Sequence, residues 1–108
     1  MKKNIKTAAL LALLALPFGC ATLLPEPMAQ DAVRSNALWP GIQLSDLQRG
    51  RKLYIANCAS CHNLHTPSEL ESAQWERIMV KMQKKAKIDD ATKDNIMQYL
   101  LTFAKTTP

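Results

Sequence analysis

Apolar residues between positions 72 and 86 recur at the spacing of an α-helix. They fall at relative positions 0, 3, 4, 7 and 11, which places all of them on one helical face. The residues of this apolar stripe are Trp75, Ile78, Met79, Met82 and Ala86. The charged residues of the segment lie mostly off the stripe, so we predict an amphipathic helix that begins near Ser72.

Two further helices are predicted on either side of it. Ser45 followed by Gln48 matches a capping box, and the helix that it starts leads directly into Cys58. Gly50 inside this helix costs about 1 kcal/mol relative to alanine, which suggests that another helix crosses closely there. The last helix begins at Asp89 or Asp90, either of which suits an N-cap. Its predicted buried face consists of Ile96, Tyr99 or Leu100, and Phe103.

The composition agrees with a small all-α domain. The chain has 108 residues, of which only three are glycine, and alternating β-branched residues are scarce. The net charge of +5 falls to +2 once Lys2, Lys3 and Lys6 are set aside, because these lysines lie in a targeting segment. The basic character is therefore poor evidence for nucleic-acid binding.

The N-terminal residues 1–19 resemble a signal peptide of the lipoprotein type. A positive end precedes the Ala/Leu run from Ala8 to Leu16, which is too short to span a bilayer. Gly19 then stands before Cys20, which would become the first mature residue and carry the lipid. Ordinary secretion and a retained anchor helix are the alternatives. In a bacterium with two membranes, Ala21 after the lipidated cysteine favours the outer membrane.

Residues 20–41 show no periodic pattern and contain three prolines, so we predict a flexible tether there and a globular domain over residues 42–108. Trp39 lies near the end of the tether, either at the edge of the core or over the edge of a cofactor. Residues 63–71, which include Pro67, form the predicted loop between the first two helices of the domain.

The motif Cys58-Ala59-Ser60-Cys61-His62 is the attachment pattern of c-type haem. The two thiols form thioethers with the porphyrin vinyl groups, and His62 ligates the iron. A dithiol redox site needs a βαβ context, and a zinc site needs more ligands than His65 and the distant Cys20. His65 follows His62 too closely to reach the opposite face of the ring, so it is predicted to be an exposed loop residue.

The segment from Gly50 to His62 resembles the opening of a small class I cytochrome c. In that family, a glycine and an aromatic residue on the first helix cross the last helix tightly. Gly50 and Tyr54 match those positions, and Tyr99-Leu100 is similar to the matching end of the last helix. The resemblance covers about residues 42–105 and implies a three-to-four-helix domain around one covalent haem.

The distal iron ligand is predicted to be Met82, on the apolar stripe. Family members of the familiar kind carry this methionine in an irregular loop, whereas Met82 and its rival Met79 lie in a helical pattern. Met97 is a weaker candidate because its helix should pack on the first. A compact subgroup of haem c domains, in which the methionine follows a tryptophan on a helix, is similar to the pattern Pro67, Trp75, Met82, Tyr99-Leu100.

These observations predict a non-enzymatic, membrane-tethered, periplasmic electron carrier with His/Met-ligated iron and protein redox partners. No nucleic acid and no small-molecule substrate are expected as partners. The alternatives are a sensor or gas- or peroxide-binding domain with an open distal site, and an electron-entry subunit of a larger oxidoreductase. Four lysines after the stripe form either a docking rim or a solvated helix face: Lys81, Lys84, Lys85 and Lys87.

Overall fold

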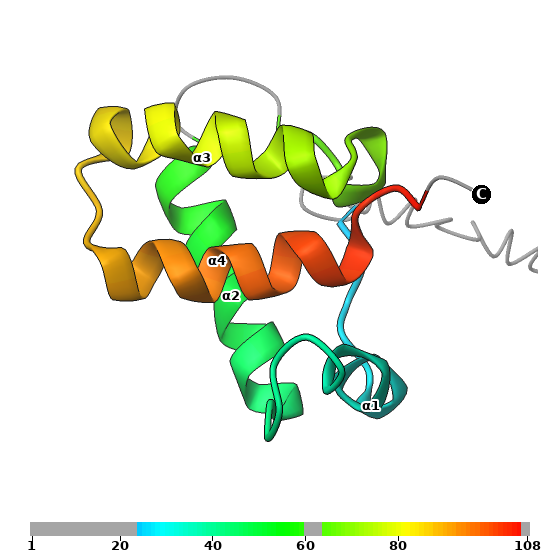
Figure 1. Cartoon of the computed structure of the whole chain (residues 1–108). Helices are drawn as coiled ribbons and strands as arrows, with labels where there is room; N and C mark the ends of the chain where they lie inside the picture. Colours follow the sequence, from blue (N-terminus) through cyan, green and yellow to red (C-terminus); the bar gives the residue numbers. More distant parts are fainter. Residues whose placement is uncertain (1–23, 60–63, 107–108) are drawn as a thin grey trace, which may run out of the picture.

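The computed structural model describes residues 24–59 and 64–106, and within these ranges the chain is helical (Figure 1). Four α-helices follow one another: α1 (Ala29–Ser35), α2 (Leu44–Cys58), α3 (Ser72–Ala86) and α4 (Asp90–Phe103). A 3-10 turn, η2 (Pro67–Glu69), precedes α3. The predicted all-α fold is confirmed.

Helices α3 and α4 run side by side in opposite directions, and α2 crosses behind both of them (Figure 1). The most extensive contact is the one between α2 and α4. Helix α1 packs against α2 near the end at which α2 begins. The end of α2 that carries Cys58 therefore lies at the opposite side of the domain from α1.

The crossing of α2 and α4 depends on Gly50, as its place in the helix predicted. A Cβ atom at this position would collide with the backbone carbonyl oxygen of Asn95 and would lie 2.8 Å from Cβ of Tyr99. Contacts this close leave no room for a side chain. The loss of helix propensity at Gly50 is thus offset by the close approach of the two helices.

Gly50→Ala is expected to lower the free energy of unfolding by about 1–3 kcal/mol, which is the usual range for overpacking. The carbonyl of Asn95 belongs to the α4 backbone and has no rotamer that would relieve the clash. Urea denaturation measures the change. Arg49→Ala on the exposed side of the same turn is the control, expected within about 0.5 kcal/mol of the wild type. A Gly50→Ala protein as stable as this control would contradict the close crossing.

The core lies between the crossing helices. Leu47 from α2 and Ile96, Tyr99 and Leu100 from α4 are fully inaccessible to solvent. Trp75 and Met79 from α3 are also buried and form a cluster with the three α4 residues, whereas Phe103 is only partly buried against this cluster. The predicted buried faces are confirmed for Trp75 and Met79 on α3 and for Ile96, Tyr99 and Leu100 on α4. The other members of the α3 stripe are only partly buried.

Tyr99 fastens the N-terminal segment to this core, because its hydroxyl donates a hydrogen bond to the carbonyl oxygen of Pro25 at 2.8 Å. Burial raises the pKa of Tyr99 to about 12, with Arg51 opposing the shift. The folded chain therefore keeps this proton to a higher pH than the unfolded chain. The resulting stabilisation is complete below about pH 10, the ordinary tyrosine pKa, and is lost as the pH rises towards 12.

The helix starts were predicted to within two residues. Asp89 caps α4 by accepting a hydrogen bond from the Thr92 amide at 2.8 Å, as expected. The predicted cap Ser45 is wrong, because α2 begins one residue earlier and its N-cap is Gln43. The carboxylate of Asp46 accepts the Gln43 amide at 2.8 Å. A charged acceptor at the third helical position thus closes this helix end in place of the serine hydroxyl.

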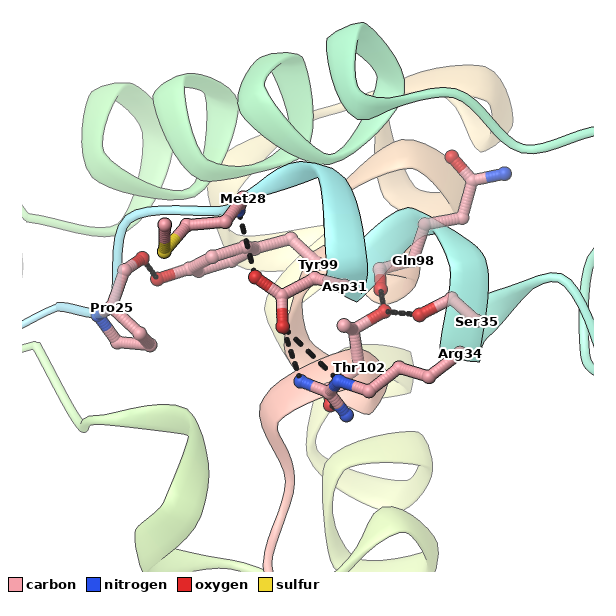
Figure 2. Close-up of polar contacts among 8 residues, drawn as sticks. All are labelled: Pro25, Met28, Asp31, Arg34, Ser35, Gln98, Tyr99 and Thr102. Carbon is pink, nitrogen blue, oxygen red and sulfur yellow. Dashed lines mark hydrogen bonds and ion pairs between the residues drawn. The ribbon is translucent and has the colours of Figure 1, made fainter.

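The structure differs from the expected flexible tether over residues 24–41. This segment contains α1, and Leu24 is buried in the core cluster. Figure 2 shows the polar contacts that hold the segment against α4. Ser35 donates to the Thr102 hydroxyl at 2.8 Å, since the Thr102 proton is used on the carbonyl of Gln98. Arg34 donates to the Thr102 carbonyl oxygen at 2.6 Å.

The polarity of α1 explains why its sequence pattern did not reveal it. Its buried residues are Asp31 and Ser35, both polar, whereas Val33 points to solvent. Asp31 accepts the Met28 amide at 2.7 Å and pairs with Arg34 at 3.0 Å. A search for an apolar stripe misses a short helix that is held by hydrogen bonds and ion pairs.

Candidate haem site

Cys58 is the last residue of α2, and its side chain is only 8% exposed within the core cluster. Helix α2 thus delivers the first thiol of the attachment motif directly to the apolar interior. The predicted site residues Cys61 and His62, and the predicted lipid site Cys20, lie outside the described residues. The structure describes the chain up to Ala59 and again from Leu64 onward.

The chain that leaves the motif is held by two aromatic residues from different helices. The hydroxyl of Tyr54 on α2 donates to the carbonyl oxygen of His65 at 2.7 Å. The indole nitrogen of Trp75 on α3 donates to the carbonyl oxygen of Pro67 at 2.8 Å. The two rings meet edge to face with centroids 6.1 Å apart. The segment from His65 to Pro67 is therefore tied to the core directly after the motif.

These two hydrogen bonds were not foreseen from the sequence. Tyr54 was expected only to cross the last helix, and Trp75 only to occupy the apolar stripe. Burial raises the pKa of Tyr54 well above its ordinary value, so this hydroxyl keeps its proton to a higher pH than an exposed tyrosine. No local pattern indicates which loop carbonyl a buried tyrosine will reach, because the pairing is set by the tertiary fold.

Tyr54→Phe is expected to lower the free energy of unfolding by about 1–3 kcal/mol, since it leaves a partly buried carbonyl without its donor. Amide hydrogen exchange should also become faster in residues 64–70. Tyr99→Phe is the matched control, because it removes the corresponding bond to Pro25 and should leave exchange in residues 64–70 unchanged. Equal exchange in the two variants would show that Tyr54 does not hold this segment.

His65 is an exposed loop residue, as predicted. Its side chain is 67% exposed, and Nδ1 lies 2.8 Å from the carboxylate of Glu69. The hydrogen bond to His65 also lowers the pKa of Glu69. A histidine that is engaged with a surface carboxylate in this way is consistent with its exclusion as an iron ligand.

The two candidate methionines occupy different environments on α3. Met79 is 3% exposed, belongs to the core cluster and lines a groove between α3 and α4 together with Met97 and Leu101. Met82 is partly buried and packs against the same cluster from its edge. Protein atoms alone therefore cover Met79 almost completely, whereas part of Met82 remains accessible.

The core cluster that contains Cys58 has apolar side chains at its edge that suit an apolar plate such as a porphyrin. Leu53 from α2, Leu64 just after the motif and Met82 from α3 all pack against the cluster that contains Cys58, and each remains partly exposed. Three separate segments thus bring incompletely covered apolar side chains to one cluster. A haem bound covalently at Cys58 would find apolar contacts here, so the residues present fit the group.

The charged residues near the end of α3 are solvated. Lys81, Lys84, Lys85 and Lys87 are all exposed, as both interpretations of these lysines require.

Over residues 24–59 and 64–106, no three His, Cys, Asp or Glu side chains gather as a metal site would need. None of the helices in these ranges has both the length and the apolarity for crossing a bilayer.

The sequence profile of a family described as dihaem cytochrome c matches residues 54–108, just over half of the chain. Comparison with curated proteins gave no match, and comparison with solved structures gave none either. The matched range starts at Tyr54 and contains the haem attachment motif, α3 and α4. On this match, together with the haem attachment motif and the helical fold around it, the chain belongs to the dihaem cytochrome c family and its domain is a c-type cytochrome domain.

Proposed function

We propose that this protein is a monohaem one-electron carrier whose iron is held by His62 and Met82. Membership of a c-type cytochrome family gives covalent haem and electron transfer as the general function. The haem supplies the redox-active iron, and the chain supplies its thioether bonds, its axial ligands and its apolar surroundings. The observation that carries the proposal is the single Cys58–His62 motif in the sequence, whose first residue, Cys58, belongs to an apolar cluster against which Met82 packs from α3.

The cysteine count supports the proposal of a single haem. The sequence contains three cysteines and one Cys-x-x-Cys-His, whereas two haems attached in this way would use four cysteines. The sequence also has only two histidines, and one of them is the exposed His65. The chain therefore offers neither a second attachment motif nor a second proximal ligand, although the family is named for two haems.

The choice of Met82 over Met79 rests on their burial. The nearly complete covering of Met79 by protein, between α3 and α4, commits its side chain to helix packing. Met82 lies three residues further along α3, at the edge of the cluster that contains Cys58. A thioether in that place can face the porphyrin without burying a charge.

An optically monitored redox titration of the purified protein tests the proposal. We expect a single one-electron component with one haem per chain, because one motif and one distal methionine make a single site. Two components, or two haems per chain by haem quantitation, would contradict the monohaem proposal. The same titration would also separate a free-standing carrier from an electron-entry subunit if it were repeated on membranes, where partner haems would appear.

We further propose that the protein is exported to the periplasm with residues 1–19 as its signal peptide, and that Cys20 carries a lipid. The support is the Ala/Leu run before Gly19-Cys20, together with the use of the other two cysteines by haem. Protein redox partners are proposed in place of a small-molecule substrate, because an iron with both axial positions filled has no open site for one.

Cys20→Ser is expected to move the protein from the membrane pellet to the soluble periplasmic fraction, because multiple acyl chains anchor a protein stably. Fractionation followed by haem staining measures the distribution. The haem spectrum should not change, since Cys20 is not part of the attachment motif. A wild-type protein that is already in the soluble fraction would contradict lipidation.

A further inference from the structure

The segment from Met28 to Leu38 has an inverted polarity. The structure describes four large apolar side chains as exposed, and three of them lie here: Met28 at 60%, Val33 at 76% and Leu38 at 65%. The polar residues Asp31 and Ser35 point inward (Figure 2). Single exposed apolar residues are common, but three within eleven positions on one surface segment indicate an apolar partner.

The charged groups of this segment are engaged in ion pairs. Asp31 pairs with Arg34 at 3.0 Å, and Glu26 pairs with Arg51 of α2 at 3.1 Å. Glu26, Asp31 and Arg34 are the charged residues between positions 24 and 41. If this segment contacted an apolar or anionic surface, both of its carboxylates would therefore meet that surface as members of ion pairs.

The length of chain before this segment limits how far the domain can lie from a membrane. This step rests on the proposed lipid at Cys20. Leu24 is buried in the core, and four residue steps separate it from Cys20. Even fully extended, these steps span at most about 14 Å at roughly 3.5 Å each. Because the chain is packed against the core from Leu24 onward, so short a link would keep the domain close to the bilayer.

We infer that residues 28–38 form a membrane-contact surface, with Met28, Val33 and Leu38 at the boundary between lipid headgroups and acyl chains. Helix α1 contacts α2 near the end at which α2 begins, whereas Cys58 is at the other end of this helix of 15 residues, about 22 Å away. Seating the domain on α1 therefore places the Cys58 end of α2 on the side remote from the bilayer. Redox partners in the periplasm would approach the domain from that side.

Thiol labelling tests this orientation, because haem and lipid block all three native cysteines of the mature protein. Val33→Cys and the control Lys84→Cys, on exposed α3, each introduce one reactive thiol. Both holoproteins are reconstituted, lipidated, in vesicles of phosphatidylethanolamine with phosphatidylglycerol. Labelling by a charged, membrane-impermeant maleimide is compared with labelling of the same variants in the soluble Cys20→Ser background.

We expect vesicles to slow the labelling of Val33→Cys by about tenfold or more, since its side chain enters the headgroup boundary, and to leave Lys84→Cys unchanged. Equal slowing, or none, in protein that sediments with the vesicles would overturn the inference while leaving the lipid anchor intact. Protein that does not sediment would overturn both. Slow, concentration-dependent labelling of Val33→Cys in the soluble background would identify a second copy as the covering partner and would also overturn it.

Discussion

Replacing Met82 by alanine is expected to convert the iron from low-spin to high-spin and to lower its reduction potential. The thioether of methionine favours reduced iron, so its loss stabilises the oxidised state. The open axial position should then bind carbon monoxide or cyanide. The weak near-red band that arises from sulfur-to-iron charge transfer should disappear from the oxidised spectrum, which provides the measurement.

Met79→Leu is the matched control for this prediction. Leucine conserves the volume of the nearly buried Met79 side chain and removes its sulfur. We expect a stability loss below about 1.5 kcal/mol and no change of spin state or near-red band. If Met79→Leu abolished the band and Met82→Ala kept it, the distal iron ligand would be Met79 and the proposal of Met82 would be contradicted.

The double substitution Cys58→Ala with Cys61→Ala is expected to abolish covalent haem attachment completely. Neither thioether can form without its thiol, and haem should then be extracted by acid acetone. Apoprotein lacking the porphyrin also loses a large apolar contact at the end of α2, so low yield of folded protein is expected.

His65→Ala is the control for this experiment, because it changes a histidine next to the motif that is exposed and paired with Glu69. Its haem content and spectrum should equal those of the wild type. Haem that resists extraction from the double alanine variant would contradict attachment through these cysteines.

The long helices were predictable because each carries an apolar face of regular spacing. Trp75 and Met79 on α3, and Ile96, Tyr99 and Leu100 on α4, are buried as the spacing indicated. The crossing point was predictable because a glycine within a helix is unfavourable unless a close contact requires it. The exact N-cap of α2 was not, because Ser45 matches a capping box, whereas the helix is capped at Gln43, whose amide is accepted by the carboxylate of Asp46.

The candidate site was only partly predictable. The motif from Cys58 to His62 identifies its cofactor because few chemistries need that spacing. The clamp that Tyr54 and Trp75 apply to the following loop was not visible, because its acceptors are backbone carbonyls that any sequence provides. The burial difference between Met79 and Met82 also needed the structure, since both lie on the same stripe.

The packing of residues 24–41 could not be predicted from hydrophobic pattern at all. Prolines and the absence of periodicity suggested a tether, yet Arg34, Ser35 and Thr102 hold this segment by hydrogen bonds. The apolar residues that a pattern search weights most, such as Val33, lie on its outer surface. The predicted flexible linker is therefore replaced, over residues 24–41, by a segment that packs against the helices of the domain.

The reaction of the reduced wild-type protein with carbon monoxide tests the central claim most directly. Iron held by both His62 and Met82 has no open position, so the reduced spectrum should be low-spin and should stay unchanged when carbon monoxide is added. A reduced protein that is already high-spin and binds carbon monoxide readily would contradict the electron-carrier assignment and favour a ligand-binding haem domain.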